Sequence, residues 1–550
     1  MVAYETRGTL FWADEWQWIL NRRGGGLGSW LDPHNEHPSL VPVALYKLLF
    51  ATVGLRHYWP YRGVLILAEL ICTLLIFVYV RRRVGGYYAL LAAALILFFG
   101  PGWQDILWPF QTAWILTALA GVGALLAIDR RDRAGDIGAC VLLGAALAST
   151  GPGLAVAVGL VIEVLQQRRR RELWIVAVPI ALYALWWLTY QHTIFSRHAL
   201  LLLPRFVFDS AAGTLSSLTG LAKVDVNHDS AGDFLSWGAP LLVLALAGMV
   251  WRLRNLGRIP PRVVTLSAIL LTFWLLTGLG RAYVSVGSLV LTATGDESRY
   301  LYIGAVFVVL LIAELARGRA SRAPLLALGI GVLAAAAIIS NLGPLRAGSR
   351  LLQMAAQGTQ GTLAALDLSR RIVPPGFAAT GLTIFIGVPP GTLYAAEHAL
   401  GSPAPTAAQL AGLPDFARQS ADVQLIQVQG LTLRGTSPTR PAGARSPTIE
   451  AIQSGTASTA NGCVRYRPDA YTPTGVVGSL QVTVPGAGLA VRAGGASATV
   501  SVRRFSSQFD QLGTLAPGAS ASLLIKPDLA SEPWHLQISA ASGFQACSLG

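Results

Sequence analysis

Ten apolar segments of spanning or near-spanning length occupy residues 63–340, and this series constrains the fold more than any other feature. A helix needs about 20 predominantly apolar residues to cross a bilayer, because the hydrocarbon core is about 30 Å thick. The series therefore predicts an α-helical polytopic membrane domain. The fourth and fifth segments are short, which is compatible with short or broken helices. The segments are 63–80, 86–100, 109–128, 136–150, 153–166, 173–190, 234–251, 263–280, 301–316 and 323–340.

Short clusters of arginine separate these segments. Positively charged loops resist translocation, so such clusters mark the cytoplasmic side of a membrane. With every cluster inside, ten crossings place residues 1–62 and everything after 340 outside. Nearly all basic residues are arginine, a bias that we interpret as a GC-rich bacterial genome, and we expect a multipass protein of the bacterial cytoplasmic membrane. The clusters lie at 81–83, 130–133, 168–171, 252–262 and 317–322.

The composition argues against two other classes of protein. Charged residues make up 13% of the chain, about half the fraction of an ordinary soluble domain. The net charge of +14 does not indicate nucleic-acid binding, because the basic residues lie in loops between apolar segments rather than on one folded face. No GxxxxGK[ST] motif is present, which argues against a nucleotide-driven pump.

The N-terminal segment poses a topological problem. Residues 1–62 would have to cross the membrane carrying Arg7, Arg22 and Arg23, with no apolar helix or signal-peptide core before them. We therefore expect that a first transmembrane helix is missing and that Met1 is a late start. The alternative is a natively translocated N-terminus.

Four parts are expected along the chain: a first extracytoplasmic loop at 1–62, a transmembrane domain at 63–340, an extracytoplasmic helical connection at 341–374, and an extracytoplasmic mainly-β domain at 375–550. Short apolar runs between Gly, Pro, Ser and Thr predict strands in the last part. The Ser/Thr/Pro/Gly-rich stretch 434–460 predicts a mobile connection. The expected strands are 479–484, 489–492, 498–503, 521–525 and 534–539.

Two cysteines flank this β-rich tail. A disulfide between Cys463 and Cys547 would suit an oxidising compartment. The two other cysteines lie in apolar runs, where they are most simply buried thiols.

An acidic pair lies among aromatic residues in the first loop. In the sequence FWADEW, Asp14 and Glu15 stand where the chain would enter the outer membrane face. A carboxylate that is partly desolvated there can act as a general base toward a hydroxyl. Two carboxylates can instead share a divalent cation. The alternative, which composition alone favours, is that both residues stand at the N-terminus of an interfacial helix.

Further polar candidates occur in the other expected outer loops. Asp105 lies between Trp103 and Trp108 in a short loop. Arg281 and Arg299 begin and end a later loop, where arginine is disfavoured by topology. A lipid phosphate is a suitable partner, because guanidinium binds phosphate through a bidentate fork. The alternatives are snorkelling at the interface or an ion pair with a neighbouring acidic residue.

Three motifs in this order resemble the multipass GT-C glycosyltransferases, which include the protein O-mannosyltransferases and the lipid A aminoarabinose transferases. The motifs are FWADEW at 11–16, HNEHPSL at 34–40 and GDESRYLY at 295–302, and the resemblance covers roughly residues 8–340. It implies inverting transfer from a polyprenyl-phosphate sugar donor, with Asp14 as catalytic base and Glu15 beside it in the acceptor site.

The same resemblance implies roles for four further residues. Glu36 and His37 would line the cleft, while Arg299, together with Arg281 and Tyr300, would hold the donor phosphate. The β-rich tail resembles the carbohydrate-binding modules appended to some relatives, with Trp534 as a candidate stacking residue; a core tryptophan is the favoured alternative.

The preferred function is therefore a glycosyltransferase that acts outside the cytoplasm on a glycan, lipid or protein acceptor, in contact with membrane lipids. One alternative is a transporter or flippase of lipid-linked sugars, which would use the same residues for binding alone. Another is a noncatalytic envelope-assembly protein whose tail does the binding. A flippase would need a polar path that continues to the cytoplasmic side.

Overall fold

The computed structural model describes residues 1–190, 196–223, 225, 234–286, 289–318, 324–382, 387–435, 445–469 and 477–549. The chain divides into two compact units. The first contains Met1–Thr9 and Asn21–Gln353, and the second contains Leu10–Leu20 and Met354–Gly550.

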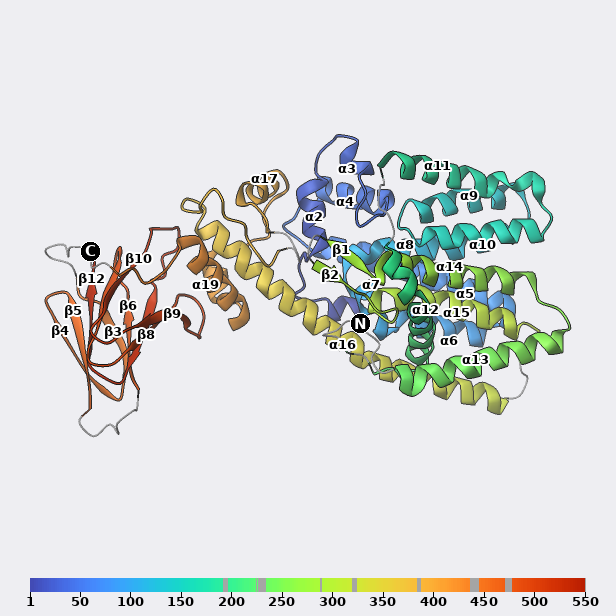
Figure 1. Cartoon of the computed structure of the whole chain (residues 1–550). Coiled ribbons are helices and arrows are strands. Elements are labelled where there is room, and N and C mark those ends of the chain that lie inside the picture. Colours follow the sequence, from blue (N-terminus) through green and yellow to red (C-terminus); the bar gives the residue numbers. More distant parts are fainter. Residues whose placement is uncertain are drawn as a thin grey trace. The chain divides into compact units, whose positions relative to one another are not determined.

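The first unit is a bundle of helices that lie side by side (Figure 1). Helix α14, at its centre, packs against α10, α12 and α15. A short antiparallel hairpin, β1 (Val284–Val286) and β2 (Leu289–Leu291), follows α14. The helices are α1 (Val2–Glu5), α3 (Gly28–Leu31), α4 (Leu40–Thr52), α5 (Trp59–Val84), α6 (Gly86–Leu97), α7 (Trp103–Leu107), α8 (Thr112–Ile128), α9 (Arg133–Leu147), α10 (Gly153–Gln166), α11 (Trp174–Tyr190), α12 (Arg197–Leu218), α13 (Phe234–Leu256), α14 (Pro261–Arg281), α15 (Ser298–Ala316) and most of α16 (Pro324–Leu368).

Among the described residues, eight helical stretches are long and apolar enough to cross a membrane, or nine if the bent pair 86–97 and 100–107 forms one span. The chain is thus an α-helical polytopic membrane protein, as the series of apolar segments predicts. The eight stretches are 59–84, 109–128, 170–190, 197–218, 237–256, 261–281, 298–316 and 324–368.

Helices α9 and α10 have 15 and 14 residues, shorter than the roughly 20 that a straight crossing needs, as the short fourth and fifth segments indicate. Helix α12 has 22 residues and passes the test by length and composition, although none of the ten expected segments lies between residues 190 and 234. The series of apolar segments omits α12 because Pro204 and Asp209 interrupt its apolar run. Residues 191–195, 224 and 226–233 lie outside the described part.

The second unit combines helices with a two-sheet β-sandwich, as expected for a mainly-β C-terminal domain. One sheet has the order β10-β7-β12-β5-β4 and the other the order β3-β6-β11-β8-β9. The helices are most of α2 (Asp14–Asn21), α17 (Pro390–Leu400), α18 (Ala407–Ala411) and α19 (Asp415–Gln429). The strands are β3 (Thr448–Gln453), β4 (Gly455–Ala460), β5 (Cys463–Pro468), β6 (Gly478–Thr483), β7 (Gly488–Ala493), β8 (Ala498–Arg503), β9 (Asp510–Leu515), β10 (Ser520–Leu524), β11 (His535–Ala540) and β12 (Phe544–Ser548).

All five expected strands are present, at β6, β7, β8, β10 and β11. The prediction of a mobile connection at 434–460 was wrong for the second half of this stretch, which forms β3 and β4. Each of these strands lies at an edge of its sheet and is exposed along most of its length. An exposed edge strand needs no alternation of apolar and polar residues, so its sequence can look like a linker. Residues 436–444 lie outside the described part.

Trp534 lies in the core of the sandwich. Its side chain is 2% exposed and belongs to the cluster of buried residues between the sheets. It is therefore a core tryptophan rather than a stacking platform on the surface.

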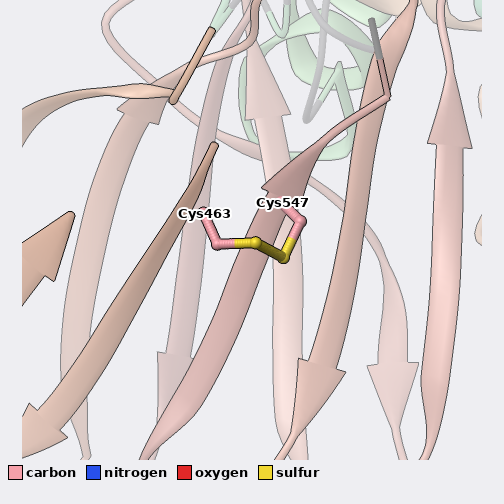
Figure 2. The surroundings of a disulfide bond; sticks show 2 residues. All are labelled: Cys463 and Cys547. Carbon is pink, nitrogen blue, oxygen red and sulfur yellow. A yellow bond between two sulfur atoms is a disulfide. The ribbon is translucent and has the colours of Figure 1, made fainter. Parts of the chain in front are cut away.

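A disulfide joins Cys463 of β5 to Cys547 of β12 (Figure 2). The two strands are antiparallel neighbours, and the cysteines face each other directly in their register. The cysteines are 84 residues apart in the sequence, so the bond links β5 to β12, the last strand of the chain.

Candidate functional site

The HNEHPSL motif at 34–40, which belongs to the first unit, begins with a tight turn. The backbone N–H of His34 donates to the carbonyl of His37 at 2.9 Å, and the N–H of His37 donates back at 3.0 Å. Asn35 and Glu36 at the centre of the turn have φ of 47° and 67°. Asparagine tolerates this left-handed region well, but glutamate does not, and the cost is of order 1–3 kcal/mol. Such strain persists where the surrounding contacts hold the turn in place.

Arg281 at the end of α14 makes those contacts. Its Nη1 lies 2.7 Å from Oε2 of Glu36, and its Nη2 donates to the carbonyl of Asn35 at 3.0 Å. The two side chains remain 21% and 32% exposed, so the ion pair lies at a surface that a ligand can reach. The guanidinium thus fixes the turn and stays accessible to an anion.

These residues lie at the rim of a cavity of about 430 Å³ in the first unit. Glu36, His37 and Arg281 supply its charged and polar groups, while helices α8, α10, α11 and α14 supply a mainly apolar wall. This combination suits a ligand with an anionic head and a hydrocarbon tail. The remaining lining residues are Trp114, Gly151, Pro152, Leu154, Ile180, Tyr183, Ala184, Trp187, Leu276, Thr277 and Gly280.

His37 is held in one orientation inside this cavity. The backbone N–H of Gly151 donates to its Nδ1 at 3.3 Å, which leaves the ring proton of the neutral form on Nε2. Burial, and then the charges of Arg281 and His34, lower the pKa of His37 from 6.5 to about 3. The ring is therefore neutral at physiological pH, a hydrogen-bond donor at Nε2 and a poor general base.

This lowered pKa predicts a pH dependence of stability. The unfolded chain takes up a proton on His37 as the pH falls through 6.5, but the folded protein does so only near pH 3. The stability contributed by neutral His37 is thus present above pH 6.5 and is lost between 6.5 and about 3. We expect the thermal unfolding midpoint of the wild type to fall more from pH 7 to about 4.5 than that of His37→Gln. Equal falls in both proteins would contradict the lowered pKa.

Arg299 and Tyr300 lie at the start of α15, outside the cavity lining. Nη2 of Arg299 lies 2.6 Å from Oε2 of Glu297, so the ion-pair alternative holds for this arginine in the structure. Tyr300 is 1% exposed, and its ring packs 5.8 Å from that of Trp114, which lines the cavity. Of the two expected phosphate ligands among the arginines, the structure places only Arg281 at the cavity.

Asp105 is fully buried in α7, close to the start of α15. It does not line the cavity. Its burial distinguishes it from an ordinary loop carboxylate. Burying an ionised carboxylate costs folding free energy unless it is hydrogen-bonded or paired.

Asp14 and Glu15 belong to the second unit, in the first turn of α2. Oε2 of Glu15 accepts the backbone N–H of Trp12 at 3.1 Å, and the side chain is fully buried. This contact satisfies a backbone donor at the helix N-terminus, as the structural alternative predicts. Asp14 is half-buried, and its Oδ1 accepts from Nε2 of Gln17 at 3.4 Å. Glu15 is thus a buried structural carboxylate, whereas the carboxylate of Asp14 is the more accessible of the two.

In the described part of the chain, no three His, Cys, Asp or Glu side chains lie together as a metal site. A cation held by Asp14 and Glu15 remains a prediction from the sequence.

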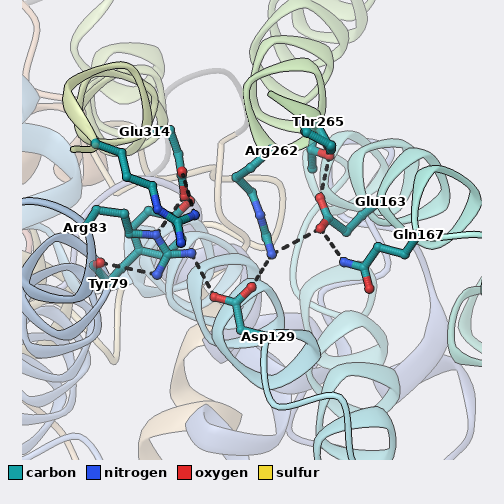
Figure 3. Close-up of polar contacts among 10 residues, drawn as sticks. Tyr79, Arg83, Asp129, Glu163, Gln167, Arg262, Thr265 and Glu314 are labelled. Carbon is teal, nitrogen blue, oxygen red and sulfur yellow. Dashed lines mark hydrogen bonds and ion pairs between the residues drawn. The ribbon is translucent and has the colours of Figure 1, made fainter. Parts of the chain in front are cut away.

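A buried ionic network that the sequence reasoning missed ties five helices of the first unit together (Figure 3). Arg83 lies 2.7 Å from both Asp129 and Glu314, and Arg262 contacts Asp129 and lies 3.2 Å from Glu163. All of these side chains except that of Asp129 are less than 10% exposed. The helices that contribute are α5, α8, α10, α14 and α15, and the neutral partners are Tyr79, Gln167 and Thr265.

The network and the cavity lie at opposite ends of α14. Arg262 and Arg281 are separated by 19 residues of one helix, which corresponds to about 29 Å, close to the thickness of a bilayer core. The network's members contact one another rather than the cavity lining. A continuous polar path, which a flippase would need, is therefore not formed by these two groups of residues.

No protein-family model and no curated protein matches the chain. Among solved structures, the chain is similar to ArnT from Cupriavidus metallidurans bound to undecaprenyl phosphate, with 12% identity and a TM-score of 0.44 over 74% of this chain and 83% of that chain. It is also similar to the arabinosyltransferase EmbB from Mycobacterium smegmatis, with 10% identity and a TM-score of 0.34 over 100% of this chain and 63% of that chain.

The third similarity concerns a smaller part. A family 29 carbohydrate-binding module complexed with mannohexaose matches 22% of this chain and 86% of its own, with 12% identity and a TM-score of 0.15. Residue roles do not transfer at such identities. ArnT and EmbB are both GT-C membrane glycosyltransferases, the class that the sequence motifs resemble.

Proposed function

We propose that the chain is a glycosyltransferase that moves a sugar from a polyprenyl-phosphate-linked donor to an acceptor outside the cytoplasm, with inversion at the anomeric carbon. The observation that carries this proposal is the cavity of the first unit, where an accessible arginine stands at the rim of an apolar wall. The acceptor classes are a glycan, a lipid or a protein.

The donor's two chemical parts fit the two parts of the cavity. An isoprenoid chain, which already lies in an apolar medium in the bilayer, can pack against Ile180, Trp187 and Leu276 without exposing them or itself to water. The phosphate would take the place of the Glu36 carboxylate on the fork of Arg281. A lipid-linked donor is also the form of activated sugar expected outside the cytoplasm, where nucleotide sugars are not available.

The proposed reaction is a single displacement. An acceptor hydroxyl attacks the anomeric carbon from the face opposite the lipid phosphate, and the carbon–oxygen bond to that phosphate breaks. The resemblance of the FWADEW motif to those of GT-C enzymes assigns the general base to Asp14, which takes the proton of the hydroxyl. Arg281 stabilises the negative charge that develops on the departing phosphate, and the Nε2–H of His37 provides a second, neutral donor in the same cavity.

The test compares wild type with Arg281→Gln in proteoliposomes supplied with radiolabelled polyprenyl-phosphate sugars. Hydrogen bonds to a charged group contribute about 1.5–3 kcal/mol, so we expect kcat/KM for transfer to fall by about 10- to 100-fold. Arg56→Gln is the matched control, since it removes an exposed arginine of the same unit that is not part of the cavity. Its transfer rate should equal that of the wild type.

Two other outcomes would replace the proposal. Label that crosses the bilayer without reaching any acceptor would indicate a flippase of lipid-linked sugars. Neither transfer nor movement, with normal folding, would indicate an envelope-assembly protein. Equal rates of transfer by wild type and Arg281→Gln would mean that the donor phosphate does not bind at this cavity.

A further inference from the structure

The outward face of one sheet in the second unit carries an array of arginines. In the sheet β10-β7-β12-β5-β4, Val464 and Tyr466 of β5 point into the core, so their neighbours Arg465 and Arg467 point outward. Arg492 of β7 is exposed in the same way, between the buried Val491 and Ala493. Alternation along the strands thus places three arginines on one face.

The strand register aligns these residues in a row across the sheet. Arg465 and Arg492 both face Gln545 of β12, from opposite sides. The row continues to Ser458 of β4 and to Ser520 of β10. Directly paired residues point to the same face, so five strands contribute one line of hydrogen-bonding side chains. Neighbouring strands are about 4.8 Å apart, which separates the two arginines by roughly 10 Å.

A fourth arginine extends the array. The backbone of Arg434 pairs with that of Ser522 in β10, through hydrogen bonds of 3.0 and 2.9 Å. Arg434 is exposed and lies beside the edge strand of the same sheet. We call Arg434, Arg465, Arg467 and Arg492, with Gln545, Ser458 and Ser520, the basic face.

The cations of the basic face are not neutralised within the described residues. Neither an ion pair nor a side-chain hydrogen bond is formed there by any of the four arginines, although Asp469 follows Arg467 two residues later. Elsewhere in the same unit, arginines are paired: Arg504 lies 2.5 Å from Asp528, and Arg370 lies 3.1 Å from Glu397. Neighbouring like charges on one face of a sheet repel each other, and a ligand of opposite charge relieves this repulsion when it binds.

The neutral members of the row narrow the chemistry of that ligand. Gln545 stands between two arginines, and serines stand at both ends, so charged forks alternate with groups that can bond hydroxyls. An apolar patch that would enter a lipid surface is not formed on the described part of this face, where Leu524 is the one large exposed apolar side chain. A polymer with both acidic groups and hydroxyls matches the row better than a membrane does.

We propose that the basic face binds an acidic glycan, in which carboxylates or phosphates about 10 Å apart engage Arg465 and Arg492 while hydroxyls bond Gln545 and the flanking serines. The proposal does not rest on the proposed function, because binding is measured without any sugar donor.

The test uses the full chain in detergent and measures binding of an oligogalacturonate, a uronate-bearing oligosaccharide, against a neutral dextran oligosaccharide of the same length. We expect the wild type to bind the acidic oligosaccharide, with affinity that falls as salt is raised. Arg465→Gln combined with Arg492→Gln should weaken this binding at least about tenfold, since it removes two charge-assisted contacts.

The matched control is Arg371→Gln combined with Arg445→Gln, which removes the same charge at two exposed positions outside that sheet. It should leave the affinity unchanged, and both double variants should keep the wild-type unfolding midpoint. Equal loss in the control would show a response to net charge alone and overturn the proposal. Equal binding of the neutral oligosaccharide by the wild type would overturn it as well. The same holds if the Arg465/Arg492 variant lost binding to phosphatidylglycerol vesicles but kept its binding to the acidic glycan.

Discussion

Asp14→Asn is expected to lower the rate of sugar transfer by at least about 100-fold, the lower end of what a general base contributes. Asparagine has the same shape and keeps the acceptor that receives Gln17 Nε2 in α2, but it cannot take up the acceptor's proton. The loss should therefore appear in kcat, with the KM for the lipid-linked donor close to that of the wild type. Single-turnover transfer of radiolabelled sugar measures this directly.

Glu15→Gln is the matched control for that experiment. Glutamine can still accept the backbone N–H of Trp12, which is the contact that Glu15 makes. We expect nearly wild-type turnover and an unchanged unfolding midpoint. If Glu15→Gln abolished transfer and Asp14→Asn did not, the base would be Glu15 and the capping interpretation of its carboxylate would be wrong.

The helical architecture could be predicted because the bilayer imposes it. Every apolar segment of sufficient length must form a helix there, since no other local structure satisfies its backbone polar groups in lipid. The series of apolar segments omits α12, because polar residues interrupt this helix. Helices α9 and α10 are short, as their segments in the sequence indicate.

The cavity was within reach of the sequence only in part. Arginine at the expected outer end of an apolar segment is a signal in its own right, and it drew attention to both Arg281 and Arg299. Their different partners depend on tertiary structure: Glu36 is 245 residues from Arg281, whereas Glu297 is two residues from Arg299. Local spacing could suggest the second pair, but no pattern in the sequence indicates the first.

The run Arg81-Arg82-Arg83 shows the same limit more sharply. In the sequence, all three residues belong to one positively charged loop. In the structure, Arg81 and Arg82 are exposed, while the side chain of Arg83 is 6% exposed and lies between two carboxylates. The distinction depends on the rotation of α5 about its axis relative to α8 and α15, which is set by packing.

Replacing Arg83 with methionine is therefore expected to destabilise the first unit by about 3–5 kcal/mol, because it leaves the buried Glu314 carboxylate without its close cation, whereas Asp129 keeps Arg262. Glu314 would keep the hydrogen bond from Tyr79 at 2.7 Å and a distant contact with Arg317 at 3.9 Å. Reversible unfolding of the protein in mixed micelles, followed by circular dichroism, measures the free energy. Arg82→Met, the adjacent exposed arginine, should change it by less than about 0.5 kcal/mol.

A second substitution separates the cost of a broken pair from the value of the pair itself. In Arg83→Met combined with Glu314→Leu, both charges are replaced by apolar groups of similar size, and most of the lost stability should return. A double variant as unstable as the sum of its single variants would mean that the arginine and the glutamate act independently. Equal effects of Arg83→Met and Arg82→Met would mean that water reaches the network and screens it. Since the network lies one bilayer thickness from Arg281 along α14, the recovered double variant should also retain sugar transfer, which would show that these ions hold the helices together without serving the cavity.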